Sequence, residues 1–151
     1  MPANWEWVVF PWVPVLWIGG WIATSIVWRR KRGKPIFPRV PTGALFSRQW
    51  ISGTSQRDVF TQLGGARGCL MVAVTGDRLI IRPNFPFNLM FLPEAYDLEH
   101  DIPRAHILSA ELRRTLFGPS AVITFRRPDG RIRTVELRSL HTEELVAALQ
   151  G

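Results

Sequence analysis

The side chains of this 151-residue chain that could support metal or nucleophile chemistry are three histidines, one cysteine and a short acidic run. His100 lies within the acidic run and His106 follows it, but neither has a partner at the His-x-x-x-His or Cys-x-x-Cys spacing typical of metal ligands. The acids around His100 are Asp97, Glu99 and Asp101. The pattern therefore favours a solvated, charged strand end, with no metal and no cofactor.

The single cysteine and the glycine-rich segment do not indicate an enzyme either. Cys69 stands beside Leu70 and Met71 without a nearby base, so we interpret it as a buried, structural thiol. Residues 64–68 are glycine-rich but lack the Gly-Lys-Ser/Thr ending of a phosphate-binding loop. A lone cysteine also rules out an intramolecular disulfide, which suits a reducing compartment.

Two surface features could take part in binding. Several arginines lie near turns in the last third of the chain, and the ordinary interpretation is a solvated face. The alternative is a face that binds phosphate or carboxylate groups, for which the guanidinium fork is suited. The predicted anion-binding residues are Arg113, Arg114, Arg126 and Arg127, with Arg131 and Arg133 nearby.

The second feature is the apolar stretch at residues 85–92, which is interrupted by Pro86 and Asn88. Large apolar residues usually belong to a core, so that is the first interpretation. The alternative is an exposed loop that contacts a partner or a membrane. The residues of this apolar contact loop are Phe85, Phe87, Leu89 and Phe91.

Tryptophan and positive charge are concentrated near the N-terminus. Residues 7–28 contain no ionisable side chain, and as a helix they would span about 33 Å, enough for the hydrocarbon core of a bilayer. Tryptophans at both ends are typical of membrane interfaces. The predicted anchor residues are Trp7, Trp12, Trp17, Trp21 and Trp28, and the basic residues that stop the segment are Arg29, Arg30, Lys31, Arg32 and Lys34.

This charge order predicts the topology. Basic residues are retained on the cytoplasmic side, so we expect the N-terminus outside and the C-terminal domain in the cytoplasm. A cleaved signal peptide would need its positive charge before the apolar run, which is the reverse order. Because 17 of the 19 basic residues are arginine, a bias that suggests GC-rich bacterial coding, we expect the bacterial inner membrane. Small residues at Gly19 and Ala23 suggest a homo-oligomer formed through this helix.

The net charge of +7 depends mainly on this short basic region. A nucleic-acid-binding protein usually spreads its basic charge over a folded face, so we expect no nucleic acid partner. The domain prediction is a membrane helix with its flank at residues 1–28, a basic and proline-rich linker at residues 29–44, and a β domain at residues 45–151.

The β domain is predicted from alternating apolar residues and turn signals. The clearest hairpin joins residues 70–75 to residues 78–82 through Gly76 and Asp77. Short helices are expected at residues 58–63 and at residues 142–150, the second with Thr142 as its N-cap. The other predicted strands are residues 46–51, 96–100, 107–114, 121–126 and 132–138.

Five to seven antiparallel strands followed by one helix favour a bent sheet or partly open barrel whose open end the helix covers. Residues 45–150 resemble small bacterial domains of the pleckstrin-homology (PH) and GRAM type. The segments that carry this resemblance are residues 72–81, Ile102-Pro103 with Ile107, Leu116-Phe117-Gly118, Ile123-Thr124-Phe125 before Asp129-Gly130, and residues 145–149. The turn at residues 75–77 lacks the basic cluster of the inositol-phosphate-binding type.

These observations together predict a fold and a function. The fold is a single-pass transmembrane α-helix joined to a mainly-β (α+β), PH-like bent sheet with a C-terminal helix. The leading hypothesis is a non-enzymatic adaptor that faces the cytoplasm and binds a protein partner beside the lipid bilayer. One alternative is a lipid-contacting module that uses residues 85–92, and the other is an accessory subunit of a membrane enzyme complex.

Overall fold

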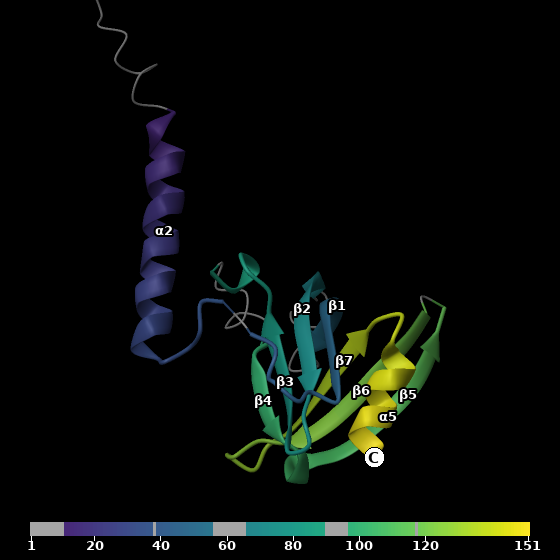
Figure 1. The fold of residues 1–151 in the computed structure, drawn as a ribbon. Coiled ribbons are helices and arrows are strands. Elements are labelled where there is room, and N and C mark those ends of the chain that lie inside the picture. Colours follow the sequence, from purple (N-terminus) through teal and green to yellow (C-terminus); the bar gives the residue numbers. More distant parts are fainter. Residues whose placement is uncertain (1–10, 38, 56–65, 90–96, 117) are drawn as a thin grey trace, which may run out of the picture. The chain divides into compact units, whose positions relative to one another are not determined.

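The computed structural model of the chain describes residues 11–37, 39–55, 66–89, 97–116 and 118–151 (Figure 1). The chain divides into two compact units, residues 1–36 and residues 37–151. Within the described residues, the first unit contains helix α2, and the second contains a seven-stranded sheet followed by helix α5.

Helix α2 runs from Trp12 to Lys31. Pro11 precedes it as the N-cap and Pro14 lies in its first turn, where a missing backbone N–H breaks no helical hydrogen bond. The last turn is basic, which is favourable beside the carbonyl groups of a helix C-terminus. Of the helix predicted at residues 7–28, the part from Trp12 onward is confirmed as helical.

The described part of the chain has no helix with both the length and the apolar character that crossing a membrane requires. The predicted transmembrane helix is therefore not confirmed. That prediction began at Trp7, and residues 1–10 lie outside the described part of the chain.

The second unit is a single antiparallel sheet in the order β4-β3-β2-β1-β7-β6-β5. A mainly-β domain that ends in a helix is thereby confirmed. The strands are β1 Phe46–Ser55, β2 Ala66–Val74, β3 Arg78–Pro83, β4 His100–Pro103, β5 Ile107–Thr115, β6 Gly118–Arg126 and β7 Ile132–Arg138. Two short 3-10 helices, Phe87–Leu89 and Arg104–His106, lie between strands.

Strand β1 joins the two halves of this sheet, with β2, β3 and β4 on one side and β7, β6 and β5 on the other. Its N-terminal part pairs with β2, and its C-terminal part pairs with β7. Between them, the pairing register with β2 shifts on both sides of Ile51, and Trp50 adopts a left-handed φ of 65°. Irregularities of this kind bend a strand and increase its twist. The bend lets one strand serve two differently directed halves.

Gly53 lies where β1 passes from one half to the other, opposite Ala66 on β2 and Leu137 on β7. A Cβ atom at residue 53 would be 2.5 Å from Leu70 Cδ1 and 3.0 Å from Leu137 Cδ2. Both leucines are fully buried, so a Cβ atom at residue 53 would have to displace side chains of the core.

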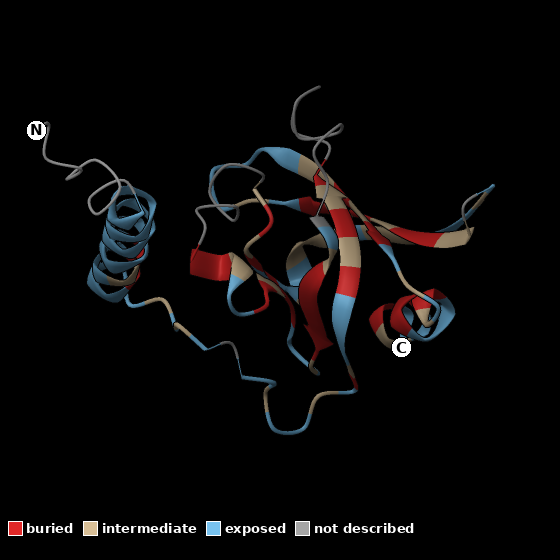
Figure 2. Ribbon diagram, turned by 90° about the horizontal axis from the view of Figure 1, so that it is seen from above, coloured by how far each residue is buried: buried red, intermediate tan, exposed pale blue. Residues whose placement is uncertain are grey.

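The core lies between the inner face of the sheet and helix α5, Thr142–Gln150 (Figure 2). Alternate residues of the strands contribute to it, because successive side chains of a strand point to opposite faces. The other face is also covered at β2 and β3, where Met71, Ala73 and Ile80 form a second buried cluster. The helix adds the apolar stripe Leu145, Val146 and Leu149. The strands contribute, among others, Leu70, Val72, Val74, Leu79, Ile81, Ile123, Phe125, Val135 and Leu137.

Most of the predicted elements are confirmed, with three exceptions. The helix predicted at residues 58–63 lies outside the described residues. The strand predicted at residues 96–100 begins only at His100. Helix α5 has His141 rather than Thr142 at its N-cap, because the Thr142 hydroxyl instead accepts the Ser139 N–H (3.2 Å) and donates to the Ser139 carbonyl (2.6 Å).

Gly53→Ala tests whether β1 needs a glycine at the point where its pairing changes from β2 to β7. The added methyl must displace buried leucine side chains, so we expect the free energy of unfolding to fall by about 1–3 kcal/mol, the usual cost of overpacking a core. The matched control is Gly76→Ala, where a Cβ has no neighbour within 4 Å, and we expect a change within about 0.5 kcal/mol. Chemical unfolding of the detergent-solubilised chain measures both; equal effects would show that the passage tolerates a side chain.

Candidate functional site

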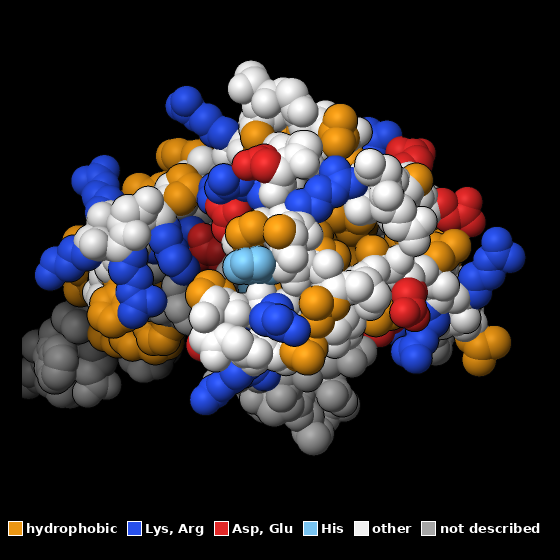
Figure 3. Space-filling view, turned by 90° about the horizontal axis from the view of Figure 1, so that it is seen from below, with side chains coloured by type: hydrophobic (Ala, Val, Ile, Leu, Met, Phe, Trp, Pro, Cys, Tyr) orange, Lys and Arg blue, Asp and Glu red, His pale blue; other side chains and the backbone are white. Residues whose placement is uncertain are grey.

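A pocket of about 320 Å³ lies between strand β4 and the turn that joins β6 to β7. His100 and His106 line one side, and Phe125, Arg126 and Arg127 line the other. We call it the β4 pocket. In Figure 3, histidine, acidic and basic side chains lie close together on the face seen from below. Within the described residues, no group of three His, Cys, Asp or Glu side chains could hold a metal ion.

His100 is buried at the base of this pocket, 6% exposed, where the sequence predicted a solvated strand end. Its ring packs edge-on against Phe125, with the ring centroids 5.2 Å apart. Within the described part of the chain, its Nε2 has no hydrogen-bond partner. Burial lowers the pKa of His100 below its ordinary value, an effect opposed by the nearby Asp97 carboxylate and reinforced by Arg127.

The prediction of a solvated strand end is wrong because alternation along the strand, and not the charge of the neighbouring acids, decides which side chains face inward. Leu98, His100 and Ile102 are all buried, and the acids at residues 99 and 101 point the other way. The alternation of apolar Leu98 and Ile102 around His100 was the signal that could have placed it inside.

An ion pair between Asp97 and Arg127 joins the segment before β4 to the turn after β6. The two side chains are 14% and 30% exposed, so water screens this pair less than a surface pair. Asp97 adopts a left-handed φ of 50°, a conformation that aspartate tolerates better than most residues. Arg127 therefore already has a carboxylate partner at the edge of the β4 pocket.

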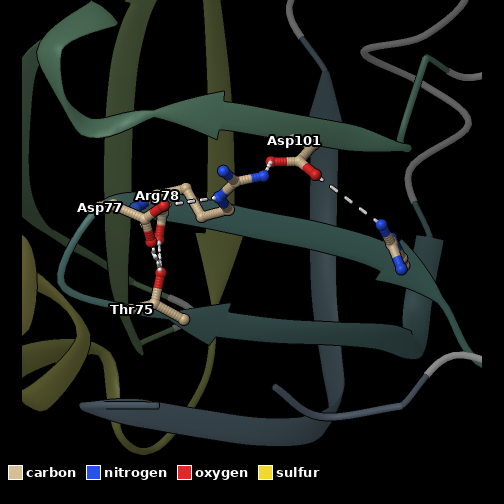
Figure 4. A network of polar contacts seen from close by, with 5 residues as sticks. Thr75, Asp77, Arg78 and Asp101 are labelled. Atoms are coloured by element: carbon tan, nitrogen blue, oxygen red, sulfur yellow. Dashed lines mark hydrogen bonds and ion pairs between the residues drawn. The ribbon is translucent and has the colours of Figure 1, made fainter. Parts of the chain in front are cut away.

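A polar network fastens the other side of β4 to β3 (Figure 4). The Thr75 hydroxyl donates to Asp77 Oδ1 (2.6 Å), and Arg78 Nε donates to Asp77 Oδ2 (3.0 Å). These hydrogen bonds lower the pKa of Asp77, and the same carboxylate raises the pKa of Arg78. Arg78 Nη1 also reaches Asp101 on β4 (3.4 Å), and Arg82 Nη2 lies 3.8 Å from the other oxygen of Asp101.

The four arginines of the predicted anion-binding face are not brought together. Arg113 lies opposite Ser120 on β6, six residues from Arg126, which corresponds to about 20 Å along the strand. Arg114 points to the opposite face of the sheet, with its Nη2 3.7 Å from Glu143 on α5. Arg126 and Arg127 both line the β4 pocket.

The predicted apolar contact loop is divided between surface and core. Phe85 is 47% exposed and its ring contacts that of Phe37, with centroids 5.1 Å apart. Phe87 is half-buried and Leu89 is buried. Phe91 lies outside the described residues. The two phenylalanines at residues 37 and 85 therefore form the exposed apolar part of this region.

The predicted anchor residues of helix α2 are exposed, with fractions from 44% at Trp28 to 68% at Trp17. Trp12 and Trp21 are also exposed, and Trp7 lies outside the described residues. The guanidinium of Arg32 lies over the Trp28 ring, 4.4 Å from its centroid, a cation–π contact at the basic end of the helix. Arg30 and Lys31 lie in the last turn of α2, and Lys34 follows three residues after the helix ends. Arg29 Nη2 donates to the Pro35 carbonyl (3.2 Å).

Comparison of the sequence with known protein families finds no match, and comparison with curated proteins finds none either. The chemistry of the site therefore has to be judged from its own residues. Cys69 is buried, and burial raises the pKa of its thiol, which makes it a poor nucleophile. The β4 pocket offers hydrogen-bond donors beside an aromatic ring, an arrangement suited to binding.

His100 makes stability depend on pH. Because its pKa is lower in the folded chain, the unfolded chain takes up a proton first as the pH falls below about 6.5. We expect the free energy of unfolding to decline as the pH falls below about 6.5, the ordinary pKa of histidine, and His100→Gln to remove most of this decline. Urea unfolding of the wild-type and His100→Gln chains at several pH values measures it. A wild-type slope in His100→Gln would contradict this assignment.

Proposed function

We propose that the chain is a non-enzymatic binding module held at the bacterial inner membrane by helix α2, with its β domain at the cytoplasmic surface. The observation that carries this proposal is the apolar surface of α2. Ten large apolar side chains of this helix are exposed: Trp12, Val13, Val15, Leu16, Trp17, Ile18, Trp21, Ile22, Val27 and Trp28.

At about 100° per residue these positions fall on every side of the helix rather than along one stripe, and most of the α2 ribbon is coloured as exposed in Figure 2. A helix on the surface of a globular protein shows one apolar stripe, whereas a helix that is apolar all round requires cover on every side. Lipid can supply such cover. The apolar stretch also extends upstream through residues 7–10, which lie outside the described part of the chain.

The basic end of α2 supports the proposed orientation. Arg29, Arg30 and Lys31 form its last turn, and Arg32 contacts Trp28, a residue type that favours the headgroup region. Each cation near an anionic membrane surface contributes about 1 kcal/mol of attraction. A membrane with the basic end at the cytoplasmic leaflet would leave residues 37–151 in the cytoplasm.

The β domain supports the binding part of the proposal. Seven antiparallel strands in the order 4-3-2-1-7-6-5 with a C-terminal helix over the inner face are compatible with the PH-like architecture that the sequence resembles. We propose that this domain recognises a protein partner through a sheet edge or the exposed side of α5. The membrane would keep the domain near partners in the same bilayer.

A second candidate function is contact of the β domain with lipid. Phe85 and Phe37 form an exposed aromatic pair, and paired phenylalanines could enter the headgroup region. Leu89 belongs to the core, so the contact would be small.

The helix can be tested by membrane fractionation of cells that produce the whole chain. We expect the wild-type chain to stay with membranes after washing with high salt and alkaline carbonate. Ile18→Asp/Trp21→Asp should release it, because each acidic residue at a helix centre costs about 2.5–3.5 kcal/mol in lipid.

The matched control is Leu140→Asp, at a residue of the β domain that is 95% exposed, and it should fractionate as wild type. Release of the wild-type chain by carbonate, or retention of the double Asp variant, would contradict the anchor. Cleavage of the β domain by protease added outside intact spheroplasts would contradict the orientation.

The second candidate can be tested with a fluorophore on Phe85→Cys in a Cys69→Ala chain in nanodiscs that contain anionic lipid. Contact with lipid predicts a blue-shifted emission relative to lipid-free micelles. The control is Leu140→Cys, whose emission should stay that of an aqueous site. Equal emission from the two labels would exclude the aromatic pair from the membrane.

A further inference from the structure

We propose that strand β5 is a self-association edge, along which two copies of this chain pair antiparallel with Leu112 opposite Leu112 of the second copy. The pairing would join two seven-stranded sheets through a two-fold axis. The inference goes beyond the proposed function and does not depend on membrane attachment.

Within the described residues no strand pairs with the outer edge of β5, and pairing with a second copy would replace the hydrogen bond that Gln150 makes to this edge. β5 is the last strand of the sheet and pairs with β6. Ser120 Oγ on β6 donates to the Arg113 carbonyl (3.3 Å), so that carbonyl points toward β6. Gln150 Nε2 at the end of α5 donates to the Ala110 carbonyl (3.0 Å), so that carbonyl points to the outer side. Because neighbouring residues alternate, the backbone groups of Leu112 also point outward.

The composition of β5 suits an interface better than a solvent-facing edge. Natural edge strands are commonly short or carry proline and inward-pointing charges that discourage pairing. β5 is nine residues long without proline, and Leu108 and Leu112 are 48% and 36% exposed. Arg114 is the charge of β5 that points toward α5, and it is paired there with Glu143. The other edge strand, β4, has four residues, ends at Pro103 and is fastened to β3 through Asp101.

Charge decides which partner fits and in which register. Glu111 and Arg113 lie on the same face of β5, opposite Val122 and Ser120 of β6. Neither makes an ion pair with any residue that the structure describes. With Leu112 on the two-fold axis, each Glu111 lies directly opposite Arg113 of the second copy, which makes two opposite-charge pairs.

The neighbouring registers are disfavoured by the same charges. A two-residue change in register in one direction places Glu111 opposite Glu111, and in the other direction it places Arg113 opposite Arg113. Like charges directly opposite one another destabilise a strand pair. The sequence of β5 is therefore complementary to itself in one antiparallel register, which favours a second copy of this chain as the occupant.

The register can be tested by disulfide cross-linking of the whole chain in lysates of cells that produce it, without separating membranes, in a Cys69→Ala background. Glu111→Cys and Arg113→Cys chains, produced with different tags, should cross-link to each other because directly opposite Cα atoms in a non-hydrogen-bonded pair lie about 4.5 Å apart. Neither should cross-link to itself, because like positions would lie diagonally, beyond the roughly 7 Å limit of a disulfide. Arg138→Cys on β7 is the exposed control.

Charge reversal tests the complementarity, with Leu112→Cys as a cross-linking reporter. Glu111→Arg places like charges opposite one another, so we expect dimerisation on the order of tenfold weaker. Adding Arg113→Glu in the same chain restores opposite charges and should restore the cross-link. All of these side chains are exposed, so rescue by the double variant also shows that the single variant failed through charge rather than folding.

Two results would overturn the proposal. The first is a mixed Glu111→Cys and Arg113→Cys yield no higher than that of Arg138→Cys, or a cross-link of Leu112→Cys to a protein of different mass. The second is a charge-reversed double variant that cross-links as poorly as the single one. Each result leaves the membrane fractionation of the chain unaffected, so the two proposals fail separately.

Discussion

The β domain depends on one strand that must belong to two halves of a sheet at once. β1 pairs with β2 over its first part and with β7 over its last part, and the change of partner takes place within a few residues around Ile51 and Gly53. A side chain at residue 53 would collide with the core, and a straight strand could not follow both halves. The inner face that results is the surface on which helix α5 packs.

This bent sheet keeps the β4 pocket and the edge of β5 apart, and the two have different physical requirements. The β4 pocket is formed where β4 approaches the turn after β6, and the Asp97–Arg127 ion pair lies at its edge. The edge of β5 remains unpaired within the described residues, while the edge at β4 is short and carries ion pairs to β3. Helix α2 belongs to a separate compact unit, and its large apolar side chains are exposed. The location and recognition that we propose would therefore belong to different parts of the chain.

Local patterns predicted the regular part of the fold and failed where distant residues decide. Alternation identified the β2–β3 hairpin, β6, β7 and helix α5, because each is defined by the spacing of its own apolar residues. The left-handed backbone at Trp50 has no sequence signal, since tryptophan is not a residue that favours it. The predicted arginine face failed because strand register and side-chain alternation, rather than proximity in sequence, separate Arg113 from Arg126 and turn Arg114 to the other face.

The direct test of the role assigned to β1 is residue-resolved native-state hydrogen exchange of the whole chain in micelles. If β1 joins the two halves into one cooperative unit, the slowest amides of β2, such as Val72, and of β6, such as Ile123, should exchange with the same free energy, equal to that of global unfolding. A distinctly lower free energy for the β5–β7 half, with the β1–β4 half still protected, would show that the halves open independently and would contradict this account.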